Sequence, residues 1–115
     1  MTQDQQAAQP ADAHALRAVL RRDLGIALKT RRAEAVAALR TTIAVIDNAE
    51  AVDPTTVGVG STEVPRRDLS IADVRAVVAD HIDDYVTEAD RYQSLGRHDA
   101  AQRLRRQADT LRTYL

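Results

Sequence analysis

Residues 70–96 read SIADVRAVVADHIDDYVTEADRYQSLG, and this stretch decides the fold class. Its apolar residues recur at steps of three and four, the spacing that keeps side chains on one face of an α-helix. Ser70 and Asp73 have the spacing of a capping box, which begins a helix, and Gly96 stands where a left-handed C-terminal residue is favoured. The sequence therefore predicts a helix that starts at Ser70 and ends just before Gly96. The buried stripe expected on it consists of Ile71, Val74, Val78, Ile82, Tyr85, Ala89 and Tyr92.

The same spacing predicts three further helices. The first follows Asp12, a plausible N-cap, and ends in a basic corner at residues 29–32, with a stripe of Leu16, Val19, Leu20, Leu24, Ala27 and Leu28. The second runs from about Ala33 to Ala49, with Val36, Leu39, Ile43 and Ile46. The last follows Gly96, with Ala101, Leu104, Ala108, Leu111 and Leu115. We expect an all-α fold of four main helices in two antiparallel pairs, joined by a long loop.

Two segments lack this periodicity. Residues 51–68, AVDPTTVGVGSTEVPRRD, hold two of the three prolines and two of the four glycines, which predicts an irregular loop. Their alternating VGVGSTEV could be extended backbone, but the sequence shows no second strand to pair with it. Residues 1–11 are rich in Gln, Ala and Asp, and we expect a disordered tail there. The helical domain is expected to span residues 12–115.

Composition limits the chemistry that this chain can perform. The 115 residues include no cysteine, phenylalanine or tryptophan and only three tyrosines, and the formal net charge is −1. Disulfides, thiolate metal sites and thiol catalysis are therefore excluded. No stretch has the roughly 18 uninterrupted apolar residues of a membrane span, and the N-terminus lacks the pattern of a secretory signal. We expect a cytoplasmic protein without a membrane role.

The residues that could suggest catalysis or metal binding have simpler interpretations. His98 and Asp99 are adjacent at the start of the last helix, so their side chains diverge, and an acid in the first turn complements the helix dipole. Asp80, Asp84 and Glu88 line one helical face, whereas a cation site needs ligands from several directions. His14 and His81 have no partner at ligand spacing. We predict no catalytic residue, no cofactor and no metal site.

Charge is distributed unevenly along the chain. Residues 68–90 contain seven acids and one arginine, whereas residues 12–46 and 91–115 each carry a net charge of +4. This segregation predicts ion pairs between the acidic helix and its basic neighbours, each worth only about 0.2–1 kcal/mol where exposed. It also leaves arginines available to contact phosphates. Composition alone does not separate these two uses.

Two segments carry a family resemblance. Residues 36–52 read VAALRTTIAVIDNAEAV and residues 92–115 read YQSLGRHDAAQRLRRQADTLRTYL. With the basic corner at 29–32 and the helix opening at Ser70, they resemble the YqeY family, whose members are similar to the tail of the B subunit of glutamyl/aspartyl-tRNA amidotransferase. The resemblance covers residues 12–115 and corresponds to the family's N-terminal helical domain, without the second, smaller helical domain that relatives often add.

The resemblance implies an all-helical module that associates with tRNA or another RNA and has no catalytic role. A carbon–nitrogen ligase label with glutamine as amido donor accompanies the family, and we interpret it as inherited from other subunits and domains. An adaptor that binds a protein partner is the alternative function. The residues expected to contact RNA phosphates are Arg21, Arg22, Lys29, Arg32, Arg97, Arg103 and Arg106.

Overall fold

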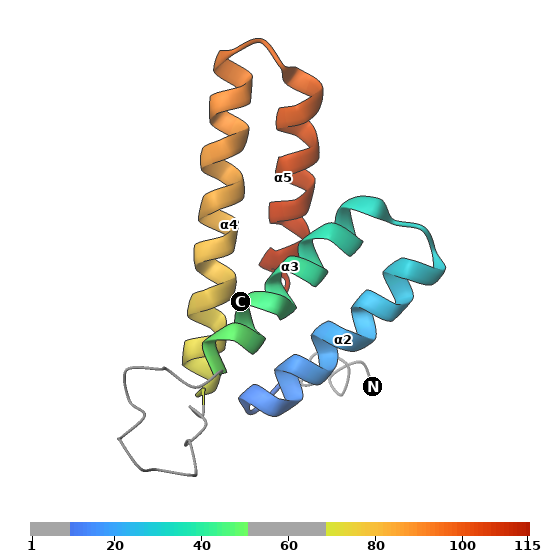
Figure 1. The fold of residues 1–115 in the computed structure, drawn as a ribbon, viewed down its shortest axis with the longest axis vertical. Helices are drawn as coiled ribbons and strands as arrows, with labels where there is room; N and C mark the ends of the chain where they lie inside the picture. Colours follow the sequence, from blue (N-terminus) through green and yellow to red (C-terminus); the bar gives the residue numbers. More distant parts are fainter. Residues whose placement is uncertain (1–9, 51–68) are drawn as a thin grey trace, which may run out of the picture.

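The computed structural model describes residues 10–50 and 69–115, and all regular structure within these ranges is helical (Figure 1). The helices in chain order are α2 (Ala13–Lys29), α3 (Ala33–Glu50), α4 (Ile71–Ser94) and α5 (His98–Arg112). The all-α fold expected from the periodicity is therefore confirmed. The expected loop at 51–68 and residues 1–9 of the expected tail lie outside the described residues.

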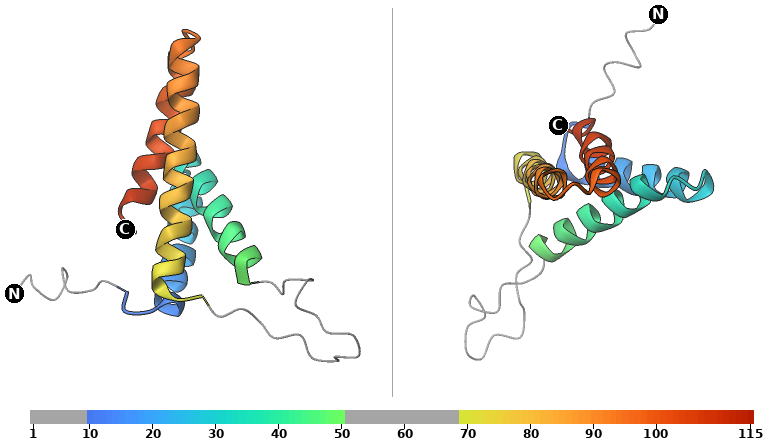
Figure 2. Two further views of the ribbon diagram at one scale, coloured as in Figure 1. Left: turned by 90° about the vertical axis from the view of Figure 1, so that its left-hand side faces the viewer. Right: turned by 90° about the horizontal axis from the view of Figure 1, so that it is seen from above.

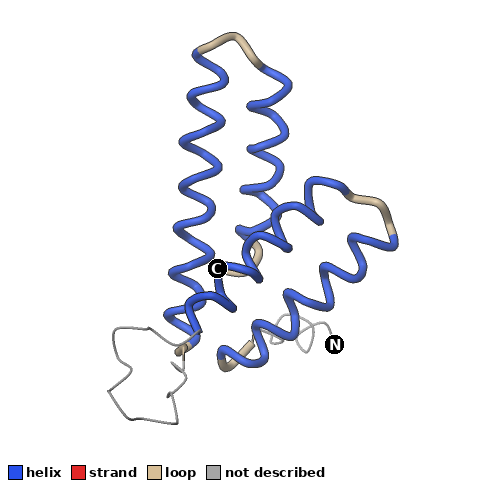
Figure 3. Tube along the Cα trace, in the orientation of Figure 1, coloured by secondary structure: helices blue, strands red, loops and turns tan. Residues whose placement is uncertain are grey.

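The helices form two antiparallel pairs, as the sequence predicts. α2 packs against α3, and α4 packs against α5, each pair being joined by a short corner (Figure 3). Two views at right angles show that α3 crosses the α4–α5 pair at an angle rather than running parallel to it (Figure 2). α3 contacts both α4 and α5, and α2 also contacts α4, so the two pairs are joined mainly through α3.

The two corners have the same backbone geometry. At the first, Arg31 has φ +57°, its N–H points to Leu28 O at 3.4 Å, and the Arg32 N–H donates to Ala27 O at 3.0 Å. This pair of bonds is a Schellman motif, which satisfies carbonyl groups that a helix end leaves without partners. The α2–α3 pair is thus closed by one residue in the left-handed conformation, Arg31, followed by Arg32.

At the second corner, the left-handed residue is the glycine that the sequence predicts there. Gly96 has φ +77°, and its N–H donates to Gln93 O at 3.0 Å. The Arg97 N–H donates to Tyr92 O at 2.9 Å. The following helix begins at once, because Arg97 O accepts from the Ala101 N–H at 3.1 Å.

The two side-chain caps that the sequence predicts, at the starts of α2 and α4, are confirmed. The Asp12 carboxylate accepts from the Ala15 N–H at 2.8 Å. Ser70 and Asp73 form the full capping box, with the Asp73 N–H donating to Ser70 Oγ at 3.0 Å and the Ser70 N–H donating to Asp73 Oδ2 at 3.1 Å. These bonds fix where α2 and α4 begin.

The core draws on all four helices. Its largest fully buried side chains are Leu16, Leu20, Leu39, Ile46, Leu111, Val74, Val78 and Thr42. The predicted burial is wrong for two residues of the stripes, because Leu28 is 46% exposed and Leu115 is 54% exposed. Both lie at the end of their stripe, Leu28 in the last turn of α2 and Leu115 beyond the end of α5. The apolar spacing of a helix can continue past the point where a neighbouring helix ends, and the apolar side chains beyond that point stay exposed.

Candidate nucleic-acid interface

Two of the seven arginines and lysines expected to bind RNA make ion pairs on α2. Arg21 lies 3.4 Å from Asp47 Oδ1, and Arg17 contacts the same carboxylate at 2.6 Å. Arg22 pairs with its neighbour Asp23 at 3.2 Å. The Arg17 and Arg21 pairs join α2 to α3, so these side chains help to hold the first helix pair together.

The acidic face of α4 makes few of the ion pairs that charge segregation predicts. Asp90 meets Arg105 of α5 at 3.4 Å, whereas Glu88 pairs with Arg91 within α4 at 3.1 Å. Asp80, Asp83 and Asp84 are exposed and make no ion pair with the residues that the structure describes. The prediction is correct for the Asp90–Arg105 contact, but the basic helices find most of their acidic partners elsewhere. Those partners lie chiefly on α3, because helix-to-helix contact, not net charge, decides which carboxylates come within reach.

Five arginines line two shallow depressions along the α2–α3 corner and α5, and we call them together the basic band: Arg31, Arg32, Arg97, Arg103 and Arg106. Arg31, Arg32 and Arg106 line one shallow depression between the α2–α3 corner and α5. Arg97 and Arg103 line a second depression at the start of α5. All five side chains belong to exposed residues.

Glu34 lines the first depression and is bound there by an arginine of α5. The Arg106 guanidinium donates a hydrogen bond to Glu34 Oε1 at 3.1 Å. This bond is the main cause that holds the pKa of the Glu34 carboxyl below its usual value, and the nearby charges of Arg106 and Arg103 lower it further. The Arg106–Glu34 bond therefore holds α5 against the N-terminus of α3.

The basic band keeps an excess of positive charge. Its two depressions are lined by five arginines against three carboxylates, those of Glu34, Asp99 and Asp109, an excess of two positive charges. α3 and α5 begin directly after Arg32 and Arg97, so the positive ends of two helix dipoles add to this potential. The surface therefore favours anions.

None of the three tyrosines lines either depression of the basic band. The guanidinium carbons of Arg91 and Arg97 lie 5.4 Å and 5.7 Å from the centre of the Tyr92 ring. Tyr85 packs edge-on against His81 with ring centres 5.2 Å apart, and the Tyr114 hydroxyl donates to Asp23 Oδ2 at 2.6 Å. Stacking of unpaired bases on aromatic rings, the usual basis of single-strand binding, has no platform here.

His98 belongs to a hydrogen-bond network at the α4–α5 corner. Its Nδ1 lies 2.6 Å from Gln93 Nε2, and Arg105 donates to Gln93 Oε1 at 3.2 Å. Arg105 also reaches Asp90, so the network ties the last turn of α4 to the first turns of α5. Within the described residues, no group of three or more His, Asp or Glu side chains could hold a metal ion.

The basic band contains four of the seven residues expected from the sequence: Arg32, Arg97, Arg103 and Arg106. Arg21 and Arg22 lie apart from it, and Lys29 is exposed in the last turn of α2 but lines neither depression. Sequence reasoning placed Arg31 in the corner but missed it as a candidate. Its position between two helices was the available signal, because a corner residue extends away from the packed faces.

Searches with protein-family models, against curated proteins and against solved structures find no match to this chain. None of the helices described here is both long and apolar enough to cross a membrane. The geometry of the basic band is therefore the main structural guide to function.

Proposed function

We propose that this chain is a non-catalytic helical module of the YqeY type that binds RNA, tRNA above all, through the basic band. The observation that carries the proposal is the separation of charge: the band lies on the α2–α3 corner and α5, while most acids of α4 remain outside it. Arginines that met the acidic face of α4 would be neutralised. Among the five arginines of the basic band, Arg106 pairs with Glu34, and the other four have no ion-pair partner among the described residues.

The contacts are to phosphates rather than to bases. Arginine presents a planar fork of donors that matches a phosphate group, and α-helices hold these forks at fixed spacing. No tyrosine lines the two depressions of the band, so the usual means of reading unpaired bases is missing there. Binding is therefore directed at the backbone of folded RNA, with weak dependence on base sequence.

Filter binding of tRNA at rising salt tests the proposal. Each phosphate contact with a duplex contributes about −0.9 to the slope of log affinity against log salt, so four or five arginines give a slope of about −4. A triple variant, Arg32→Gln with Arg103→Gln and Arg106→Gln, should bind far more weakly and reduce the slope by about 2–3.

The matched control removes the same charge elsewhere. Arg21→Gln, Arg22→Gln and Arg91→Gln together change three exposed arginines outside the basic band. If the band is the interface, this variant keeps most of the tRNA affinity and nearly the full salt slope. Equal losses in both triple variants would mean a diffuse charge effect, and no binding of the wild type at about 50 mM salt would overturn the proposal.

The carbon–nitrogen ligase label that accompanies the resembled family belongs, in this proposal, to other subunits. No catalytic role is assigned to any residue of this chain. Purified protein should release no ammonia from glutamine, alone or with tRNA, and measured release would contradict the proposal.

A protein-binding adaptor is the second candidate function, and one observation favours it. Ile26 and Leu28, close to the α2–α3 corner, are 50% and 46% exposed. Apolar side chains in such positions are common in protein interfaces, although single exposed residues are also ordinary. Affinity capture from lysate with and without nuclease separates the two functions, since an adaptor's partners survive nuclease and RNA-linked partners do not.

A further inference from the structure

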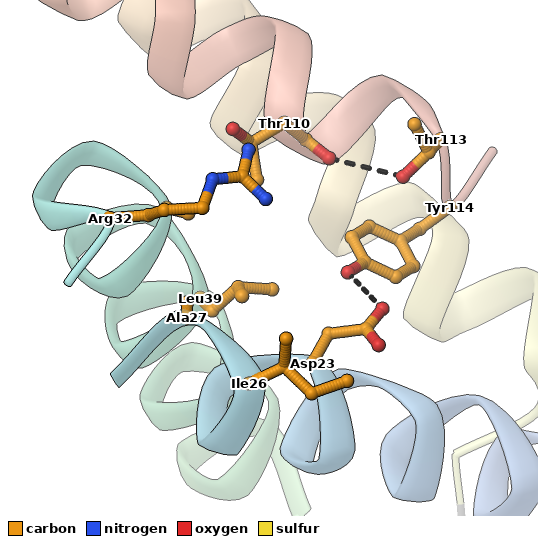
Figure 4. Close-up of a pocket in the computed structure, with 9 residues that line it drawn as sticks. Asp23, Ile26, Ala27, Arg32, Leu39, Thr110, Thr113 and Tyr114 are labelled. Atoms are coloured by element: carbon orange, nitrogen blue, oxygen red, sulfur yellow. Dashed lines mark hydrogen bonds between the residues drawn. The ribbon is translucent and has the colours of Figure 1, made fainter. Parts of the chain in front are cut away.

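A cleft of about 310 Å³ lies where α2, the start of α3 and the end of α5 meet (Figure 4). Its floor is apolar and consists of Ala27, Ala35 and Leu39, each of them buried. Two of its walls carry opposite charges, Arg32 on one side and Asp23 on the other. A volume of this size is at the lower end of small-molecule sites, which span about 300–1,000 Å³.

The two charged walls do not neutralise each other. Arg32 and Asp23 make no ion pair, and the Asp23 carboxylate is held instead by its neighbours. Its Oδ2 accepts from the Tyr114 hydroxyl at 2.6 Å, and its Oδ1 accepts from Arg22 at 3.2 Å. Burial, and then the bond to Asp23, raise the pKa of Tyr114, so this tyrosine stays protonated and remains a donor. The carboxylate is thereby fixed at the edge of the cleft with accepting capacity left over.

Two threonines add acceptors but no free donors. Thr110 Oγ1 donates its proton to Arg106 O at 3.0 Å, and Thr113 Oγ1 donates to Thr110 O at 3.1 Å. Each hydroxyl has only one proton, so both oxygens can only accept from a ligand. The cleft therefore combines one cationic donor, Arg32, with a wall of acceptors above an apolar floor.

We infer that this cleft binds a free aliphatic α-amino acid such as leucine, which goes beyond the RNA-binding function. The ligand carboxylate meets Arg32, its ammonium group donates to Asp23 and Thr113, and its side chain covers Ala27, Ala35 and Leu39. A simple anion would satisfy Arg32 but face the Asp23 carboxylate, and a simple cation would face the opposite conflict. A zwitterion with an apolar side chain satisfies both walls and the floor.

Titration of ¹⁵N-labelled protein with leucine, followed by NMR, tests this assignment. Saturable shifts are expected at the amides of the cleft residues. N-acetylleucine lacks the ammonium charge and leucinamide lacks the carboxylate, so each should bind at least about tenfold more weakly, the scale of one lost charge-assisted hydrogen bond. No saturable shift with leucine up to about 10 mM, well above the 1 mM that corresponds to weak binding, would overturn the inference, as would equal binding of either analogue.

Variants separate the cleft from the rest of the surface. Arg32→Gln and Thr113→Val should each weaken leucine binding, while Arg40→Gln, an exposed change outside the cleft, should leave it unchanged. Thr113→Val keeps the Asp23–Tyr114 bond, so its effect is not a loss of that contact. Unchanged leucine affinity in both cleft variants would contradict the assignment.

The same variants keep this inference distinct from RNA binding. Asp23→Asn removes the carboxylate charge that meets the ammonium group of the ligand, so it should weaken leucine binding. It should leave tRNA affinity within about twofold, since it removes no cation from the basic band. Arg32→Gln should lower both affinities, because Arg32 belongs to both surfaces. Failure of leucine binding with normal tRNA binding would thus reject the cleft alone.

Discussion

At the scale of single residues, Arg31 is the clearest departure from what local physics favours. It occupies the left-handed position of the first corner with φ +57°, where the second corner uses Gly96 with φ +77°. A side chain with a Cβ atom in this conformation costs about 1–2 kcal/mol. The strain falls in the basic band, where an arginine at the corner is available to a ligand.

Arg31→Gly should raise the free energy of unfolding by about 1 kcal/mol, because glycine adopts the left-handed conformation without that cost. The same substitution should weaken tRNA binding, since it removes a cation from the basic band. Gly96→Ala should do the opposite to stability and lower it by about 1 kcal/mol, although nothing within 4 Å would touch the new methyl group. Urea denaturation measures both, and a destabilised Arg31→Gly variant would show that the side chain itself stabilises the corner.

Thr42 is the other residue at odds with its surroundings. It is fully buried, and its Oγ1 has no hydrogen-bond partner among the described residues. A buried hydroxyl without a partner costs about 1–3 kcal/mol. Thr42→Val replaces it with a methyl group of the same shape, so the free energy of unfolding should rise by about 1 kcal/mol.

The control for this change is Thr87→Val on the exposed face of α4. It alters the same atoms in water and should shift stability by less than about 0.5 kcal/mol. Urea denaturation again gives the comparison. A loss of stability in Thr42→Val, with no change in the control, would mean that the hydroxyl makes a favourable contact.

At the scale of elements, the helix ends could be predicted because their signals are local. The Ser70–Asp73 capping box and the left-handed Gly96 each depend on a few consecutive residues, so their spacing in sequence was enough. The burial of Leu28 and Leu115 could not be predicted in the same way. Whether a helix end is covered depends on how far a neighbouring helix reaches, and periodicity contains no information about that distance.

The candidate site was predictable only in part for the same reason. The composition identified which segments are basic, and four arginines of the band came from it. It did not reveal that Arg21 meets Asp47 of α3, or that Arg106 and Glu34, 72 positions apart, form a hydrogen bond. The cleft between α2, α3 and α5 brings together Asp23 and Tyr114, which are 91 positions apart, and no spacing rule connects residues so distant in sequence.

The contact between α3 and α5 gives a prediction about pH. Hydrogen bonding by Arg106 holds the pKa of Glu34 below its usual value of 4.5. A carboxyl whose pKa is lowered by folding stabilises the folded state above the unfolded pKa, and this contribution is lost as the pH falls through the folded pKa. Glu34→Gln should therefore be less stable than the wild type at pH 7 and lose less stability as the pH falls below about 4.5.

Urea denaturation from pH 7 to pH 3 measures this difference. Asp80→Asn on the exposed face of α4 is the matched control, since Asp80 makes no ion pair with a described residue. It should follow the pH dependence of the wild type closely. Equal pH dependence of Glu34→Gln and the wild type would show that the Glu34–Arg106 bond does not hold α3 to α5 in solution.

At the scale of the whole molecule, the two helix pairs are not independent units. One cluster of buried residues includes Leu16 and Leu20 of α2, Leu39 and Ile46 of α3, Val74 and Val78 of α4, and Ala108 and Leu111 of α5. A helical hairpin alone could not bury such a set, because each pair covers the apolar face of the other. Unfolding is therefore expected as a single cooperative transition.

Leu111→Ala tests that coupling. Leu111 is fully buried near the end of α5, and its truncation should cost about 2–5 kcal/mol through lost burial and the cavity left behind. Leu95→Ala, at a position 64% exposed, is the control and should cost less than about 0.5 kcal/mol.

If the four helices share one core, hydrogen exchange at the slowest amides of α2 accelerates in Leu111→Ala as much as exchange in α5. The free energy of global opening limits both, because neither pair opens fully without the other. Faster exchange confined to α4 and α5 would instead show two separately stable helix pairs. The basic band, which includes residues of the α2–α3 corner and of α5, would then span an interface that opens more readily than either pair unfolds.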